Sequence, residues 1–241
     1  SWFSDFSLSH NREKIKELAS GQLKDEANAW FVGEPFKVFY DYKKEGIWQL
    51  GEEAAAAANG QEPGDIKVQD VDGNGVITTD DRIIYSQRPD VTFGFNNTFN
   101  YKGFDLSVFL YARLGQWIAY DYNTTYRINA LENGGNVDYW TPENPTNAFP
   151  RPNKSKSYTQ VTYYSTLKYE DGSFFKIRDI TLGYTFKPEL LKHLNLSKLR
   201  VYATAKNFFT FSKIDNYDPE QGGSISFPMT KQLVFGLNVE F

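Results

Sequence analysis

An aspartate-rich loop at residues 70–81 carries the clearest candidate for site chemistry. Its sequence is DVDGNGVITTDD, and the first half fits the calcium-loop pattern D-x-[DN]-x-[DN]-G. In this pattern, oxygen ligands alternate along the chain, and a glycine at position six permits the sharp turn that gathers them. The sequence therefore predicts a calcium site whose ligands are Asp70, Asp72, Asn74, the backbone carbonyl of Val76, and Asp81.

The last of these ligands departs from the usual pattern. Position twelve of an EF-hand loop is a bidentate glutamate, whereas Asp81 has a shorter side chain, so we expect a weaker site or one completed by water. Ile77, at position eight, is expected to pack inward. Residues 82–85 look extended rather than helical, so the ion would pin a long loop rather than act in a helix-loop-helix sensor. A solvated Asp/Gly turn that needs no ion is the alternative.

Aromatic residues form a second candidate site around residues 119–172. Their rings could stack on sugar rings, although a packed loop or an interfacial aromatic belt has the same composition. The residues are Trp117, Tyr120, Tyr122, Tyr126, Tyr139 and Trp140. We identify no nucleophile-base arrangement, and His10 and His193 lie far apart in a chain without cysteine, so an enzyme is not expected. The formal net charge of -4 gives no reason to expect nucleic-acid binding.

The elements that must hold these residues are predicted to be β-strands. Residues 91–101 and 104–112 alternate apolar and polar side chains around a short turn at Tyr101-Lys102-Gly103, which is typical of a tight hairpin. Similar alternation occurs at 2–8, 173–187, 199–206 and 231–241. Elsewhere we expect mixed loop with some helix over 12–34, extended structure over 35–50, an alanine-rich helix over 51–59, and a helical turn over 189–194.

The connections between these strands alternate in length. Those near 102 and 187–198 are short, whereas those at 12–90, 119–172 and 211–229 are long. Membrane barrels have short periplasmic turns and long extracellular loops, so the pattern indicates an all-β, antiparallel transmembrane β-barrel segment. About six strands cannot close such a barrel, because the usual minimum is about eight. A secreted calcium-stabilised glycan-binding β-sandwich is the alternative, since it shares the aromatic-rich composition.

The final strand has the features of a barrel-insertion signal. Gly236 is followed by Leu237, Val239 and Phe241, which lie on the face expected to meet lipid. A simple edge strand is the alternative interpretation. We expect Phe241 to end the natural protein and Ser1 to lie inside it.

Six stretches that cover most of the chain carry a wider resemblance. They are GEPFKVFYDYKKEGIWQ, PGDIKVQDVDGNGVITTDDR, FGFNNTFNYKGFDLSVFLYARLG, DGSFFKIRDITLGYTF, LRVYATAKNFFTFSKIDNYDPE and FPMTKQLVFGLNVEF. In this order they resemble the C-terminal region of SusC/RagA-type TonB-dependent outer-membrane transporters. The resemblance implies a barrel of about 22 strands with a plugged lumen, of which this chain supplies the last quarter. The N-terminal plug would lie upstream, outside this chain.

The same resemblance implies a function and a set of partners. Members of the family import glycan or peptide fragments across the outer membrane of Gram-negative bacteria. A SusD-like surface lipoprotein closes over the barrel as a lid, and the TonB complex supplies energy through the missing N-terminal region. The long connections would then face the lid and the substrate, and the barrel wall would face outer-membrane lipid. The motifs do not identify the substrate or the residues that bind it.

Overall fold

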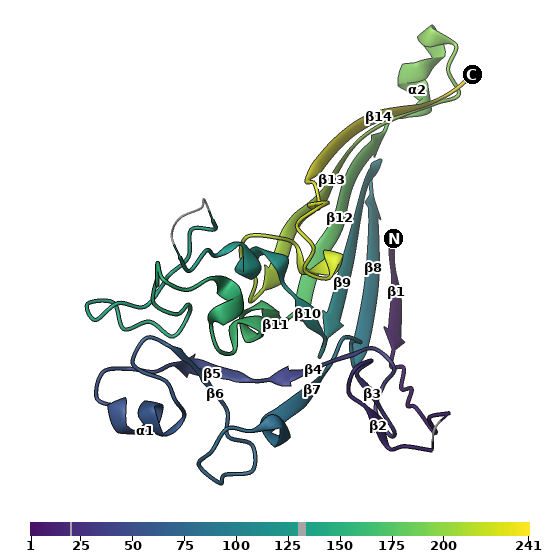
Figure 1. Ribbon diagram of the computed structural model, residues 1–241. Helices are drawn as coiled ribbons and strands as arrows, with labels where there is room; N and C mark the ends of the chain where they lie inside the picture. The colour runs from purple at the N-terminus through teal and green to yellow at the C-terminus, as the bar shows by residue number, and fades with distance from the viewer. Residues whose placement is uncertain (20, 130–133) are drawn as a thin grey trace.

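A six-stranded antiparallel sheet is the main element of the computed structural model, which describes residues 1–19, 21–129 and 134–241. The strand order is β1-β8-β9-β12-β13-β14, so neighbours in the sheet follow the order of the chain (Figure 1). The strands are β1 (Trp2–Ser9), β8 (Val91–Tyr101), β9 (Phe104–Leu114), β12 (Phe174–Thr185), β13 (Lys198–Ser212) and β14 (Gln232–Glu240). The predicted all-β, antiparallel fold with six long strands is confirmed.

A two-residue turn joins β8 to β9. Lys102 and Gly103 have positive φ angles of 49° and 89°, the backbone twist that a tight antiparallel hairpin favours. Tyr101 therefore pairs directly with Phe104. Gly103 also allows a close approach, because a Cβ at this position would lie 2.8 Å from the carbonyl oxygen of Thr185.

The strand registers give the sheet two chemically different faces. One row across all six strands is entirely apolar, and it consists of Trp2, Phe99, Leu106, Leu182, Ala203 and Phe235. The next row lies on the opposite face and is mostly polar, with Phe3, Thr98, Ser107, Thr181, Thr204 and Val234. We call these the outer face and the inner face. Large side chains of the outer face are exposed, since Phe235 retains 77% of its accessible surface.

All three long connections leave the same end of the sheet (Figure 1). They span residues 10–90, 115–173 and 213–231, compared with the expected 12–90, 119–172 and 211–229. The opposite end carries the two-residue turn and residues 186–197, which contain the short helices α2 (Pro188–Leu191) and η5 (Lys192–Leu194). Short and long connections therefore alternate along the chain.

The first two long connections contain small strand pairs and one α-helix. The pairs are β2 (Lys24–Asp25) with β3 (Trp30–Phe31), β4 (Val38–Tyr42) with β7 (Arg82–Ser86), β5 (Lys44–Ile47) with β6 (Ile66–Val68), and β10 (Trp117–Ala119) with β11 (Tyr169–Asp171). The helix α1 (Glu53–Ala58) lies inside the predicted range 51–59. The expectation of some helix over 12–34 was wrong for the described part of that range, which holds the β2–β3 pair instead.

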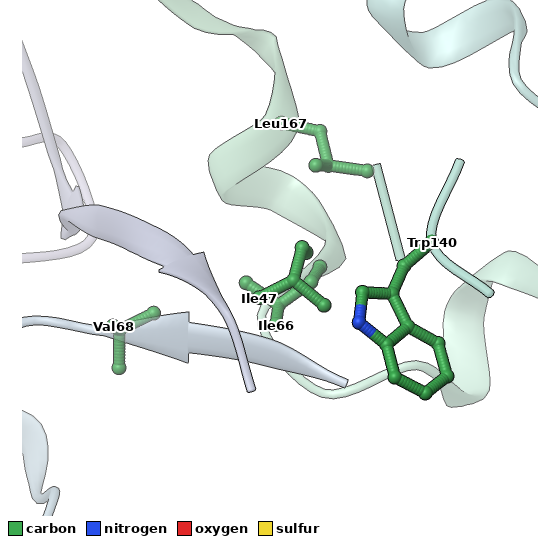
Figure 2. Packing of buried hydrophobic residues seen from close by; sticks show 5 residues of the cluster. All are labelled: Ile47, Ile66, Val68, Trp140 and Leu167. Carbon is green, nitrogen blue, oxygen red and sulfur yellow. The ribbon is translucent and has the colours of Figure 1, made fainter. Parts of the chain in front are cut away.

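These two connections fold together into one unit, which we call the cap (residues 10–90 and 115–173). Its hydrophobic core combines Ile47, Ile66 and Val68 from the first connection with Trp140 and Leu167 from the second (Figure 2). Leu167 is held on the 3-10 helix η4 (Tyr164–Lys168). The cap therefore has a buried interior of its own, separate from the sheet.

Within the described residues, no helix is long and apolar enough to cross a membrane.

Candidate functional site

The structure gathers three of the predicted calcium ligands in the 70–81 loop. Oxygen atoms from the carboxylates of Asp70, Asp72 and Asp81 all lie within 4.8 Å of one another. The backbone N–H groups of Gly73 and Gly75 donate to Asp70 at 2.8 and 2.7 Å, so the chain curls around this side chain. Both glycines have positive φ angles, of 73° and 84°, which glycine adopts without steric cost.

Asn74 extends this cluster through Asp72. Its Nδ2 donates to Oδ2 of Asp72 at 2.7 Å, and its Oδ1 accepts a hydrogen bond from the backbone N–H of Val76 at 2.8 Å. Three of the five predicted ligand positions therefore contribute carboxylate oxygens to one small region, and Asn74 meets it through its NH2 group. Val76 supplies its N–H to the loop, and its predicted role as a carbonyl ligand stays a prediction.

Asp81 is the buried member of the cluster. Its carboxylate accepts hydrogen bonds from the backbone N–H groups of Val71, at 2.8 Å, and Thr78, at 2.7 Å. The backbone hydrogen bond from Thr78 is the largest of the contacts that hold the pKa of this carboxyl below its usual value. Asp81 also closes the capping box of the 3-10 helix η1 (Thr79–Asp81), which fixes its position.

The loop is anchored to the rest of the cap by Ile77. Its side chain packs against the cap core, as the sequence predicts, and its N–H donates to Oδ1 of Asn59 at 3.2 Å. Arg82–Ser86 then continues as strand β7, so no second helix follows the loop. The loop is thus anchored to the cap and carries a set of hard oxygen donors, which is the chemistry that calcium requires.

An ion cluster on the inner face of the sheet was not predicted. Lys176, on β12, is fully buried, and its Nζ lies 2.6 Å from Asp218 and 2.8 Å from Glu220. Arg178 lies 3.2 Å from the other oxygen of Glu220. Asp218 is the N-cap of the 3-10 helix η6 (Pro219–Gln221) and Glu220 lies within it, so the cluster fastens the third long connection to the inner face.

Three of the six candidate sugar-stacking residues are buried, and Trp117 and Tyr122 are half-buried. Tyr120, Tyr126 and Trp140 are buried, and the hydroxyl of Tyr126 donates to the carbonyl of Pro150 at 3.0 Å. Burial raises the pKa of Tyr120 to about 12. Tyr139 differs, because it is exposed. The three buried rings therefore fit the packed-loop interpretation.

The predicted insertion signal lies on the edge strand β14 and just after it. Leu237 and Phe241 are exposed, and Val239 pairs with Leu199 on the outer face. Gly236 faces Tyr202, and a Cβ on this glycine would lie 2.3 Å from the tyrosine ring. Gly236 therefore makes room for that ring, and its part in barrel insertion stays a prediction.

Comparisons with known proteins bear on the whole chain. No family model matches the sequence. TonB-dependent receptor P3 of Formosa agariphila is 30% identical over 277 residues, which include all of this chain and 27% of the receptor. TonB-dependent receptor P26 of the same organism is 31% identical over 272 residues, again 27% of its length. TonB-dependent receptor SusC of Bacteroides thetaiotaomicron is 28% identical over all of this chain and 24% of its own length.

Solved structures show the same relationship. The RagAB peptide transporter superposes with a TM-score of 0.75 and 23% identity, covering all of this chain and 27% of that one. The RagAB peptide importer in its open-open state gives 0.69 and 25% identity. The chain matches a segment of SusC/RagA-type receptors. It spans about a quarter of the length of the curated relatives it matches.

The SusC/RagA-type match decides between the two folds expected from the sequence. The six-stranded sheet is a segment of a RagA/SusC-like barrel, and the β-sandwich alternative is not supported. The relatives are named as receptors and transporters rather than enzymes, in agreement with the absence of a predicted catalytic arrangement.

Proposed function

We propose that this chain forms part of a TonB-dependent outer-membrane importer of glycan or peptide fragments in a Gram-negative bacterium. The largely apolar outer face of the sheet, backed by a mostly polar inner face, carries the proposal. Barrel strands alternate in this way because one face meets lipid and the other lines the lumen. The similarity to TonB-dependent receptors, SusC among them, and to the RagAB peptide transporter supports the same function.

In this proposal the two ends of the sheet face different compartments. The cap and residues 213–231 lie outside the cell, and the Lys102-Gly103 turn and residues 186–197 lie in the periplasm. A SusD-like surface lipoprotein closes over the cap as a lid. The TonB complex acts through a region outside this chain.

Transport and membrane location test the proposal together. The complete receptor that contains this chain is expressed in its host, and uptake of labelled glycan and peptide fragments is compared with and without TonB. We expect the receptor in the outer-membrane fraction and TonB-dependent uptake of one of the two substrate classes. A receptor found in the soluble periplasmic or secreted fraction would contradict the proposal, as would uptake that does not need TonB.

We also propose that the 70–81 loop binds calcium as a structural ion. The support is the group of carboxylate oxygens from Asp70, Asp72 and Asp81 that lie within 4.8 Å of one another. A bound divalent cation would offset the repulsion among these carboxylates and stabilise the cap. The side chains of Asp70 and Asp72 lie toward solvent, which leaves a route for the ion.

Calorimetry on the complete receptor tests the calcium site. We expect calcium-dependent heat that is lost in Asp72→Ala and retained in Asp80→Ala. Asp80 is the matched control because it is exposed, belongs to the same loop and lies outside the carboxylate group. Absence of calcium-dependent heat, or equal heat in the two variants, would show that the loop is a solvated turn.

A further inference from the structure

A partly open cavity of about 250 Å³ lies between the long connections, apart from the 70–81 loop. It is lined by Lys44 and Tyr85 from the first connection, by Trp117, Tyr169 and Glu170 from the second, and by Lys213 from the third. Drug-sized ligands occupy sites of roughly 300–1,000 Å³. This cavity therefore suits a smaller ligand.

Six charged residues line this cavity, and Lys213 pairs with Asp171 at 3.0 Å, whereas Lys44 and Glu170 are half-buried and form no ion pair with each other. Nζ of Lys44 donates to the carbonyl oxygen of Ala148 at 2.5 Å, and Oε1 of Glu170 accepts from Nδ2 of Asn123 at 2.9 Å. Burial lowers the pKa of the Lys44 ammonium and raises the pKa of the Glu170 carboxyl. Each charge is therefore partly desolvated, with only part of its hydrogen-bonding capacity used by the protein.

The aromatic side chains that line the cavity contact one another. Tyr85 and Tyr169 stack on each other at 5.3 Å, and Trp117 meets Tyr85 edge-on at 4.7 Å. Phe39 packs against Tyr169 at 5.0 Å. These rings pack on one another, and the half-buried charges of Lys44 and Glu170 are the recognition elements on which the proposal rests.

We propose that this cavity binds a zwitterionic ligand of amino-acid or dipeptide size, with its carboxylate at Lys44 and its ammonium at Glu170. The inference rests on the proposed import function and favours peptide-derived over neutral glycan ligands at this site. A ligand with both charges compensates the two buried groups at once, whereas a neutral sugar compensates neither.

Calorimetry on the complete receptor in detergent tests the site with diglycine as the probe. We expect diglycine to bind, and N-acetyl-diglycine amide and sucrose, which are uncharged, to bind at least about tenfold more weakly. Lys44→Met and Glu170→Gln are each expected to weaken diglycine binding at least about tenfold. Lys37→Met, an exposed change elsewhere in the cap, is the matched control and should leave binding unchanged.

A paired variant separates ligand recognition from simple misfolding. Lys44→Glu combined with Glu170→Lys keeps one charge of each sign in the cavity, so it should recover part of the binding that either single change loses. No binding of diglycine to the receptor, or equal binding to the receptor and both single variants, would overturn the site. TonB-dependent uptake is measured on the same variants, and uptake that persists while diglycine fails to bind would reject this site and leave the import function intact.

Discussion

The sheet and the cap place their apolar residues differently. The cap buries them in a core, whereas the sheet exposes them on its outer face. In the cap, Ile66 is completely buried in a core that two connections share, as in a protein that folds in water. In the sheet, Phe235 and Leu182 lie on the outer face and are largely exposed, while polar residues line the inner face. One chain therefore contains two regions suited to two different solvents, which is what a barrel wall with an extracellular cap requires.

The ion cluster around Lys176 stabilises the mostly polar inner face of the sheet, and removing it should give the largest effect. Lys176→Met would leave Asp218 and Glu220 buried next to each other without their main cation, at a cost of about 3–5 kcal/mol. We expect residues 213–231 to detach from the inner face. Hydrogen exchange measured by mass spectrometry on the complete receptor should show faster exchange there.

A matched change on the same face controls for loss of any lysine. Lys206 lies 3.7 Å from Asp179 but remains 46% exposed, so Lys206→Met should cost at most about 1 kcal/mol. Equal exchange in the two variants would show that burial of the Lys176 cluster contributes nothing to the position of this connection.

A change in the cap core tests whether the cap is a separate unit. Ile66→Ala removes a fully buried side chain and is expected to destabilise the cap by about 2–5 kcal/mol. Limited proteolysis of the complete receptor should then cut within residues 10–90 while the sheet stays protected. Leu50→Ala, at a residue that is 60% exposed, is the control, and simultaneous loss of the sheet would argue against two independent regions.

A charge on either face of one central strand sharpens the contrast within the sheet. Val108 belongs to the outer face, where it pairs with Ile180, and Ser107 belongs to the inner face. Val108→Arg is expected to cost about 2–4 kcal/mol near the middle of a bilayer, and Ser107→Arg much less. Folding of the complete receptor into lipid vesicles measures the difference, and equal yields would contradict the assignment of the two faces.

Lowering the pH should destabilise the cap through protonation of Asp81, and this effect is expected to be the smallest of those predicted. Its pKa is lower in the folded protein than the usual value of 3.8, so its stabilising contribution is full above that value. The contribution is lost as the pH falls through the depressed pKa. Near-ultraviolet circular dichroism of the complete receptor should therefore change below pH 3.8, and Asp81→Asn should show a weaker pH dependence in that range.

The sequence was sufficient to predict the long strands because each strand encodes its own alternation. The Lys102-Gly103 hairpin could be located for the same reason, since a tight turn depends on its own residues. The carboxylate group at residues 70–81 was also accessible, because its members lie within twelve positions of one another. Local pattern and local geometry agree in these segments.

Features that depend on contacts between distant segments could not be predicted. Lys176 alternates on its strand like any inner-face residue, and only the fold brings Asp218 and Glu220 to it. The β2–β3 pair replaced the expected helix because Trp30 and Phe31 pack against Phe36 and Tyr40. The charged, mixed composition of residues 12–34 did not indicate these ring contacts.

The β10–β11 pair, which we call the neck, closes the second connection of the cap next to the sheet and affects how the barrel wall is assembled. β10 and β11 pair through Trp117 with Asp171, three residues beyond the end of β9 and three before the start of β12. Gly172 also donates its N–H to the carbonyl of Gln116 at 2.9 Å, which continues the ladder. Closing the cap at its neck removes most of the loop-closure entropy that would otherwise oppose pairing of β9 with β12.

The neck also limits how far those two strands can slide past each other, although its pairing of Trp117 with Asp171 is offset by one residue from the pairing of Arg113 with Phe174. A slip of one residue between β9 and β12 would turn every side chain of one strand toward the opposite face. The cap therefore helps to hold β9 and β12 in the alignment that keeps one face of the wall apolar and the other mostly polar.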